Sequence, residues 1–434
     1  MLQSIKKTLP KPVKKRLVTI KQKTYDQWQK KQLTKSMQVK HAALLQQIKG
    51  KEKIKVVFLA VNESIWKVDT VFQKMLKDPL FEPEVLVCPY TVYGKDTMLK
   101  EMELAYDYFK EKGYPVQKSL NNDGSWLTLD EIKPDIVFFT NPHDLTRKEY
   151  YENAYLNYLS CYAGYGIAVS RYRNYQDQYN QDFHNAVWSI FLQHETGMIL
   201  SKKYAANKGA NTCLVGDTNI EEMLGSTNQK KVWKEQSNKK IKIIWAPHHT
   251  ITDNDITMLP YSTFLKYSEI MMDIAKDFEA TIQFAFKPHP VLKSKLYQYP
   301  LWGKEKTDTY YNFWQNGTNT QLDEGEYIAL FQQSDAMIHD SGAFTAEYVF
   351  LNKPVIHLGK KGIESFFNDF AIEAYNCHYK AHSSADILKF IHSDISNDPM
   401  ANTRKKFIKK YSYVVGDINQ PSELIIANIK NELG

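Results

Sequence analysis

The sequence predicts an α/β protein of two Rossmann-like, doubly wound domains with a cleft between them, preceded by a basic helical arm. Apolar, β-branched runs alternate with amphipathic stretches from residue 53 onward, which is typical of parallel sheets covered by helices. The alternation restarts after a polar stretch at 225–240, so it describes two units. A chain of 434 residues is long enough for two domains of about 150–200 residues each.

The first unit is expected to occupy residues 53–224 and to bind the acceptor, and the second to occupy 225–400 and to bind a nucleotide donor. In the first unit we expect strands in 54–61, 84–90, 134–142, 198–201 and 211–216, and helices in 65–77, 97–113 and 182–194. A tyrosine-rich segment, 158–172, lies between them without an assigned element. In the second unit we expect strands in 241–247, 281–290, 335–340 and 354–358, and helices in 261–278, 326–334 and 342–351. Residues 401–434 are expected to form further helices, with packing back on the first domain as one option.

The positive charge of the chain is concentrated in an N-terminal arm, residues 1–52. Residues 1–49 contain 13 lysines or arginines and one acid, whereas the remainder holds 43 basic and 48 acidic residues. A slightly acidic body argues against nucleic acid as a partner. Apolar side chains recur among the lysines at roughly helical spacing, so we expect a helix that binds an anionic membrane surface, with about 1 kcal/mol from each basic residue. The alternative is a solvated or self-associating helix.

The expected location is the cytoplasm, at the inner face of a bacterial membrane. No apolar run reaches the roughly 18 residues of a membrane-spanning helix, and the N-terminus lacks the apolar core of a secretion signal. The four cysteines lie far apart without a CxxC pair, which favours a reducing compartment over a disulfide framework or a structural zinc site.

The strongest functional signal follows the strand expected at 335–340. Asp340 ends this strand, Ser341 and Gly342 form a turn, and a helix begins at once. Ligands of open α/β sheets bind beyond the carboxyl ends of strands, and the first N–H groups of a helix bind anions such as a diphosphate. The small residues Gly342 and Ala343 would let phosphates approach the backbone, and Glu347 would accept hydrogen bonds from ribose hydroxyls. Taken alone, a Ser-Gly helix cap is more often a structural feature.

Two other strand ends carry histidines. His289 lies between two prolines, and Pro290 biases it towards an extended conformation. It would donate to a phosphate oxygen or protonate the departing nucleotide diphosphate. His248, His249 and Thr250 follow the strand at 241–247 and are expected on the same rim of the sheet. Zinc is the rival interpretation, but adjacent histidines suit the usual ligand spacing poorly, so we expect no metal there.

Residues 241–358 resemble the nucleotide-binding half of the CDP-glycerol glycerophosphotransferases, the teichoic acid primases and polymerases. The resemblance covers about a quarter of the chain and rests on Lys287-Pro288-His289-Pro290, Leu330, Ser334-Asp335, Asp340-Ser341-Gly342, Glu347-Tyr348 and Lys353-Pro354, in that order. It implies a GT-B architecture, a CDP-linked donor and no required divalent metal or other cofactor. It also implies that His289 is essential at the donor diphosphate, that Ser341 and Gly342 meet phosphates, and that Glu347 meets the ribose.

The first domain departs from this family. The family's polymerases carry a His-Gly-Thr element there, whose histidine is thought to be the acceptor's base. The nearest segment in this chain, residues 162–166, reads Tyr-Ala-Gly-Tyr-Gly and has no histidine, although Trp66-Lys67 is family-like. A replacement base is open among Asp69, His248, His249 and a tyrosine.

The leading interpretation is a transferase that moves a polyol phosphate, glycerol phosphate first, from a CDP-linked donor to a lipid-linked or glycan acceptor in teichoic acid, capsule or related polymer synthesis. The expected catalytic residues are His289, His248 and Asp340. The expected donor-binding residues are Lys287, His249, Thr250, Ser341, Gly342, Ala343 and Glu347. The alternatives are a GT-B glycosyltransferase that uses a nucleotide sugar, a sugar epimerase of similar fold, and a non-catalytic scaffold of a surface-polymer complex.

Overall fold

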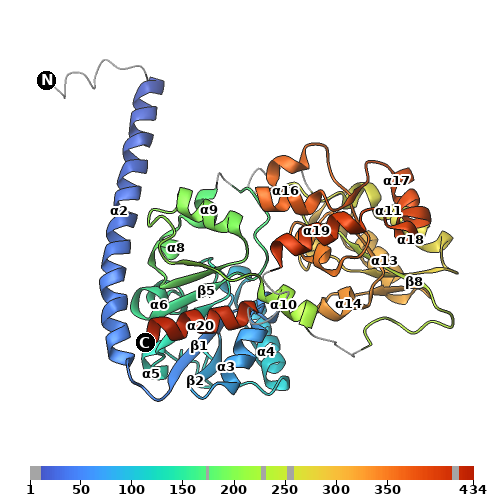
Figure 1. Cartoon of the computed structure of the whole chain (residues 1–434). Coiled ribbons are helices and arrows are strands. Elements are labelled where there is room, and N and C mark those ends of the chain that lie inside the picture. The colour runs from blue at the N-terminus through green and yellow to red at the C-terminus, as the bar shows by residue number, and fades with distance from the viewer. Residues whose placement is uncertain (1–10, 173–174, 226–230, 252–258, 413–419) are drawn as a thin grey trace.

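The computed structural model describes residues 11–172, 175–225, 231–251, 259–412 and 420–434. Two parallel α/β domains lie side by side, and a long helix, α2 (Lys11–Ile48), runs along the outer side of the first (Figure 1). The predicted two-domain α/β architecture is therefore confirmed. None of the described helices is long and apolar enough to cross a membrane.

The first domain is built on a seven-stranded parallel sheet with the order β3-β2-β1-β4-β5-β6-β7. Its strands are β1 (Ile54–Ala60), β2 (Phe81–Val87), β3 (Val116–Lys118), β4 (Ile136–Phe139), β5 (Leu159–Ala163), β6 (Ser189–Leu192) and β7 (Thr212–Leu214). Its helices are α3 (Asp69–Lys77), α4 (Lys95–Glu111), α5 (Leu129–Ile132), α6 (Glu152–Asn157), α7 (Gln176–Tyr179), α8 (Asp182–Ala186), α9 (Glu195–Tyr204) and α10 (Thr218–Gly225). The strand order reverses between β1 and β4, which makes that boundary the switch point of the sheet.

The second domain is built on a six-stranded parallel sheet with the order β10-β9-β8-β11-β12-β13. Its strands are β8 (Ile241–Ala246), β9 (Ile282–Phe286), β10 (Thr320–Leu322), β11 (Ala336–His339), β12 (Val355–His357) and β13 (Tyr379–Lys380). Its α-helices are α11 (Phe264–Asp277), α12 (Leu292–Gln298), α13 (Gly303–Asn316), α14 (Ile328–Gln333), α15 (Phe344–Glu347), α16 (Asp369–Tyr375), α17 (Ser384–Lys389), α18 (Ile395–Asn397) and α19 (Ala401–Tyr411). Here the order reverses between β8 and β11.

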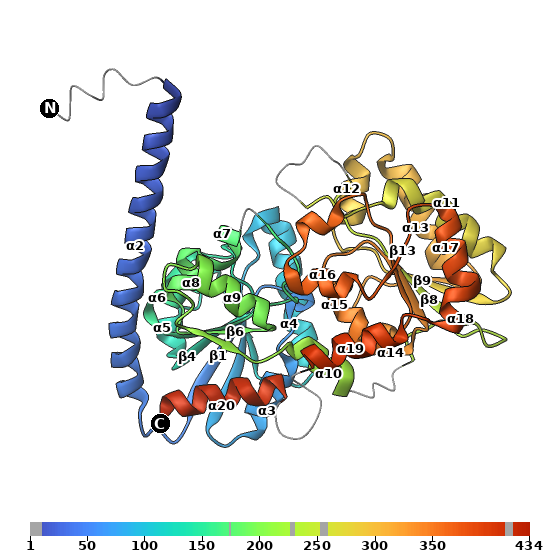
Figure 2. The ribbon, with the colours of Figure 1, turned by 45° about the horizontal axis from the view of Figure 1, so that its top comes forward.

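Each sheet is buried on both faces, as continuous apolar strands predict. Successive residues of β1 point to opposite faces: Phe58 belongs to one core cluster, and Val57 and Leu59 belong to another. In β8, Ile244 and Trp245 are likewise assigned to separate clusters. The helix α9 packs against β6 and β7 in the first domain, and α11 packs against β9 in the second (Figure 2).

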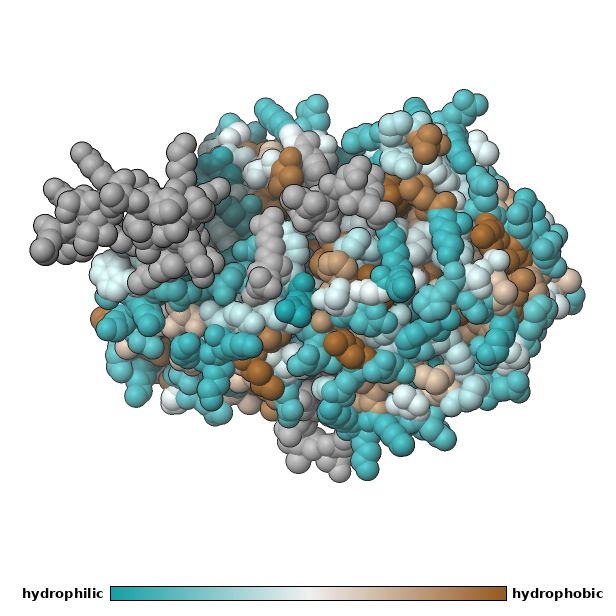
Figure 3. Space-filling view, turned by 90° about the horizontal axis from the view of Figure 1, so that it is seen from above, coloured by the Kyte–Doolittle hydropathy of each residue, from teal (hydrophilic) through white to brown (hydrophobic). Residues whose placement is uncertain are grey.

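The helix α2 is only partly an arm. Its C-terminal half packs on the first domain, where Met37 and Ile48 are buried in the core clusters and Lys30 donates to the carbonyl of Asn180. Its N-terminal half extends beyond the rest of that domain (Figure 1). Seen from this end, the described surface is mostly hydrophilic, and its apolar residues form separate patches (Figure 3).

The two helices of the C-terminal segment lie on different domains. The helix α19 packs against α16 in the second domain, whereas α20 (Pro421–Leu433) packs against α3, α10 and α2 in the first. Ser422 fixes α20 by donating from its backbone N and its hydroxyl to the Glu221 carboxylate, at 2.8 and 2.6 Å. The first domain is thus completed by residues that follow the second.

Two expected elements of the first domain are wrong. The helix expected over 182–194 is the short helix α8 followed by the strand β6, and the strand expected at 198–201 lies inside the helix α9. In α9, Leu200 is buried while Ile199 is 64% exposed, and the side chain of His194 caps the helix by accepting from Gly197 N at 3.1 Å. Short apolar runs fit both periodicities, and the cap decides between them only in three dimensions.

Candidate functional site

The switch point of the second sheet brings three predicted strand ends together. The loop 248–250 follows β8, the turn 340–343 follows β11, and His289 lies just beyond β9, the other neighbour of β8. Ligands of doubly wound sheets bind in the crevice beyond the carboxyl ends of the strands at such a point. The topology therefore places the donor-site candidates at the position where this architecture binds ligands.

His248, His249 and His289 form one cluster. The ring centroid of His249 lies 4.3 Å from that of His248 and 4.1 Å from that of His289. Burial, followed by neighbouring positive groups, lowers the pKa of His289 to about 4 and holds the pKa of His248 well below its ordinary value. These two imidazoles are therefore neutral at pH 7 and act through hydrogen bonds.

The hydrogen bonding of His289 indicates which ring nitrogen carries the proton. Its Nδ1 lies 3.4 Å from the backbone N of Val291, near the limit for a hydrogen bond, and this contact favours the neutral tautomer that carries its proton on Nε2 and can donate there. The three rings approach closely enough for a metal ion, since one nitrogen of each lies within 4.8 Å of the others. A metal on Nε2 of His289 would require the proton on Nδ1, where Val291 already donates. The absence of a metal at this cluster stays a prediction. The tautomer of His289 with its proton on Nε2 supports it.

Asp340 is hydrogen-bonded to the backbone of the loop that carries His248. It is fully buried, and its carboxylate accepts from the backbone N–H groups of His248 and Thr263 and from the Thr263 hydroxyl, the last at 2.8 Å. Burial, the largest effect, raises the pKa of Asp340 to about 7. We predicted a catalytic residue here, but in this arrangement Asp340 does not reach the crevice. It is a positioning residue that fixes the loop carrying His248.

Two predicted donor-binding residues are also turned inward. Lys287 is 6% exposed, and its ammonium donates to the carbonyl of Gly325 and lies 3.3 Å from Asp323 Oδ1. Thr250 is buried, with its hydroxyl 3.0 Å from Nδ1 of His248 and 3.2 Å from the backbone N of Ser262. Their side chains hold the surrounding loops in this arrangement and do not line the crevice, which corrects the prediction of direct donor contacts.

In the turn after β11, the backbone is closely approached by a neighbouring side chain and offers N–H groups to a ligand. A Cβ atom on Gly342 would lie 3.1 Å from Cε2 of Tyr261, so a larger residue would displace that ring. The backbone N–H groups of Gly342 and Ala343 have no hydrogen-bond partner among the described residues. The helix expected over 342–351 is shorter than predicted: α15 has four residues and continues as a 3₁₀-helix, Tyr348–Leu351. The dipole of so short a helix adds little, and the N–H groups themselves are what the turn offers to an anion.

A pair of buried histidines, which the sequence analysis did not single out, supports this turn. The backbone N–H of Ser341 donates to Nδ1 of His339 at 3.1 Å, which leaves the proton of His339 on Nε2. That nitrogen lies 3.1 Å from Nε2 of His378, whose Nδ1 lies 2.9 Å from the carbonyl of Ala374. One consistent set of tautomers satisfies all three contacts, so the backbone N–H of Ser341 is fixed and is not available to a phosphate.

Glu347 joins the two domains. Its carboxylate accepts from the Tyr327 hydroxyl at 2.6 Å and lies 3.5 Å from Nδ2 of Asn219, which belongs to α10 of the first domain. Burial and then Asp217 raise the pKa of Glu347 to about 7. Lys67, from the first domain, lies with its ammonium 4.4 Å from the centre of the Tyr327 ring. A ribose would reach Glu347 only after exchanging these contacts.

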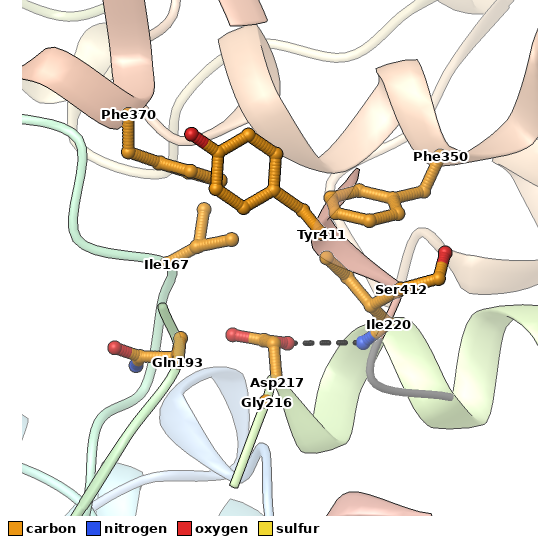
Figure 4. Close-up of a pocket in the computed structure, with 9 residues that line it drawn as sticks. All are labelled: Ile167, Gln193, Gly216, Asp217, Ile220, Phe350, Phe370, Tyr411 and Ser412. Carbon is orange, nitrogen blue, oxygen red and sulfur yellow. Dashed lines mark hydrogen bonds between the residues drawn. The ribbon is translucent and has the colours of Figure 1, made fainter. Parts of the chain in front are cut away.

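A small cavity lies nearby, between the domains (Figure 4). Asp217 lines it and accepts from the backbone N of Ile220 at 3.0 Å. The cavity has a volume of about 10 Å³, which is room for a single water molecule and not for a substrate.

The first sheet has its own switch point, between β1 and β4. His143 follows β4 there, exposed, with its backbone N–H donating to Asn141 Oδ1 at 3.0 Å. Although the residue as a whole is exposed, burial of part of its ring lowers the pKa of His143 below its ordinary value. Tyr165, which follows β5, lies 6.4 Å away between ring centroids. His143 is not part of a His-Gly-Thr element, the motif expected in this domain. The available signal was a histidine in the loop immediately after a predicted strand.

Asp69, one option for the acceptor's base, is wrong on geometry. It is buried, and its carboxylate accepts from the Trp66 indole at 2.7 Å and from the Tyr114 hydroxyl and the Lys112 ammonium, each at 2.9 Å. These contacts tie α3 to the end of α4 and leave the carboxylate no access to a substrate.

No known family model and no curated protein matches this chain. Solved structures do resemble it. S. aureus MnaA in complex with UDP superposes with a TM-score of 0.54 at 16% identity, covering 88% of this chain and 97% of that one. The UDP-GlcNAc 2-epimerase of Neisseria meningitidis bound to UDP-GlcNAc gives 0.52 at 14% identity, covering 87% and 100%.

A variant of the wall teichoic acid polymerase TagF gives a TM-score of 0.55 at 12% identity, covering 88% of this chain and 90% of that one. Identities this low relate folds and not activities. Together with the two switch points described above, these similarities show that the chain has the two-domain GT-B fold.

Proposed function

We propose that the protein transfers a polyol phosphate, glycerol phosphate first, from a CDP-linked donor to a lipid-linked or glycan acceptor during surface-polymer synthesis. The observation that carries the proposal is the cluster of His248, His249 and His289 beside the 341–343 turn. Neutral imidazole N–H groups and two backbone N–H groups suit a diphosphate.

In this reaction the acceptor hydroxyl attacks the β-phosphorus of the donor. A new P–O bond forms to the acceptor, and the bond from the β-phosphorus to the bridging oxygen breaks, so that CMP leaves with the electron pair. His289 donates from Nε2 to the departing phosphate and stabilises the charge that develops there. In-line positioning of the two substrates supplies much of the remaining acceleration.

A base must accept the proton of the acceptor hydroxyl, and we assign this role to His143. The carboxyl ends of both sheets line the crevice of this architecture, so His143 at the β1/β4 switch point would face an acceptor as His289 would face the donor. A pKa below the ordinary value keeps the ring unprotonated and able to accept a proton at pH 7.

A thermal-shift panel of nucleotides is the test of the donor. We expect CDP-glycerol or CDP-ribitol to stabilise the protein more than CMP, CDP, UDP and UDP- or GDP-sugars do. Stabilisation by UDP- or GDP-sugars alone would instead support a nucleotide-sugar glycosyltransferase, or an epimerase. No shift with any nucleotide would contradict catalysis and support a scaffold.

The N-terminal half of α2 is proposed to bind an anionic membrane surface and to bring the protein to a lipid-linked acceptor. Its support is the basic sequence of residues 1–49 and two exposed aromatic residues, Tyr25 and Trp28, with ring centroids 6.0 Å apart. Tryptophan and tyrosine favour the membrane interface. We expect the chain to float with phosphatidylglycerol vesicles and not with neutral phosphatidylcholine vesicles, and flotation with neither would contradict this attachment.

A further inference from the structure

A second and larger cavity, of about 310 Å³, lies in the first domain beside α2. It is bounded by α2, the end of α8, the strands β6 and β7, and α20, whose C-terminal end lies next to α2 in Figures 1 and 2. We call it the α2 cavity. Its lining residues are Thr34, Met37, Gln38, His41, Ala42, Leu45, Asn185, Ala186, Val187, Trp188, Ser189, Asn207, Ala210, Asn211, Cys213, Asn428 and Glu432. A volume of this size reaches the lower end of the range for small-molecule sites.

One polar side chain of the α2 cavity has unused hydrogen-bonding capacity. His41 is 8% exposed, and its Nε2 has no hydrogen-bond partner among the residues that the structure describes. Burial, followed by Lys40, lowers the pKa of His41 to about 4, so the ring is neutral at pH 7. Because this nitrogen is itself buried, a ligand in the cavity would pair with it only after the side chains around it shift.

The charge of the lining disfavours an anionic ligand. The lining contains no lysine or arginine, and its one acidic residue is Glu432. A phosphate would meet this carboxylate without a compensating cation, and burying an unpaired charge is expensive. Apart from the His41 imidazole and the Cys213 thiol, the remaining polar side chains are amides and hydroxyls, and Trp188 adds an aromatic surface. This is the chemistry that hydrogen-bonds hydroxyl groups while packing against the apolar side of a ring.

Several of these amides are already used within the protein. The Asn211 amide donates to the carbonyls of His184 and Val187, at 3.1 and 2.7 Å, and so builds the wall. Asn428 is held less tightly: its amide donates to Cys213 Sγ at 3.2 Å, and it accepts from the Ser189 hydroxyl at 3.4 Å, near the limit for such a bond. Asn428 and Ser189 can therefore exchange their contacts for those of a ligand.

We propose that the α2 cavity binds a neutral, hydroxyl-rich ligand of the size of one or two sugar rings, such as a unit of a glycan. This site is separate from the histidine cluster of the second domain and does not depend on the donor proposed above. Because α2 forms one wall, a bound ligand would link this helix to α20 and to the sheet.

The test is saturation-transfer NMR on the full chain with glucose, N-acetylglucosamine and maltose as neutral probes and glucose 1-phosphate as the charged probe. The informative variant is Ala210→Trp, because Ala210 is exposed at the cavity and an indole there would fill it without replacing a buried side chain. The matched control is Ala280→Trp, at an exposed alanine of the second domain.

We expect at least one neutral probe to give a signal that Ala210→Trp abolishes and Ala280→Trp retains. A second variant, Glu432→Lys, places a cation in the lining at an exposed position and is expected to add a glucose 1-phosphate signal that the unmodified chain lacks. If no neutral probe gives a signal sensitive to Ala210→Trp while the variant remains folded, the proposal is overturned. If Ala210→Trp does not fold, an unchanged glucose 1-phosphate signal in Glu432→Lys overturns it instead.

Discussion

Replacing His289 with alanine is expected to lower kcat/KM about 100- to 1000-fold, the range for loss of one donor to a developing negative charge. The expected loss of activity comes from removing the Nε2–H group of His289. The neutral tautomer set by Val291 presents an N–H that strengthens its bond as charge collects on the departing phosphate. The measurement is initial-rate kinetics with the donor that the thermal-shift panel identifies. The thermal shift by that donor should fall as well, because the same N–H binds the ground-state diphosphate.

Two further variants make this result interpretable. His289→Gln keeps an N–H donor and is expected to retain more activity than His289→Ala. His382→Ala removes an exposed histidine of the same domain and should leave the kinetics unchanged. Equal activity in His289→Ala and in the unmodified protein would remove His289 from the donor site while leaving the fold assignment intact.

Replacing His143 with phenylalanine is expected to lower kcat about 100-fold, the lower end of the range for general-base catalysis. The donor-induced thermal shift should not change, because His143 lies in the first domain. Phenylalanine keeps a ring against Tyr165 and removes only the titrating nitrogens. The pair of measurements separates a base from a residue that merely supports the fold, since the latter would lower stability and donor binding together.

The pH dependence of kcat tests whether His143 acts as a base. The protein lowers the pKa of His143 below its ordinary value, so the basic form is lost only as pH falls below that ordinary value. We expect kcat to fall on the acid side and to be level at pH 7–8, and the acid limb to disappear in His143→Phe. Asp144→Asn, at the exposed neighbour, should keep the acid limb. A profile that is identical with and without His143 would assign the proton transfer to another group.

The sequence predicted where strands end but not which way the side chains beyond them point. His289 was recognised because two prolines restrict its backbone, and this local effect needs no tertiary information. Asp340 and Lys287 also lie at strand ends, yet both are buried against loops from distant parts of the chain. Their partners, Thr263 and Asp323, are separated from them in sequence and are invisible to a strand-end argument.

The same limit explains the other differences. Glu347 has the expected place in the chain, but its contact with Asn219 depends on how the two domains meet. His143 directly follows an expected strand, but its place at the switch point is known only once β1 and β4 are seen to be neighbours. Propensity and periodicity established the two sheets, whereas the crevice between them is a property of strand order.

The position of α20 has a consequence for biosynthesis. Ile425 and Ile429 are fully buried in the core of the first domain, although the ribosome makes them after the entire second domain. Domains usually fold as units and in the order of synthesis. In this chain the second domain is continuous and can fold as soon as it emerges, whereas the core of the first lacks Ile425 and Ile429 until α20 has been made. We therefore expect the first domain to complete its folding after the second, with apolar core surface exposed in the meantime.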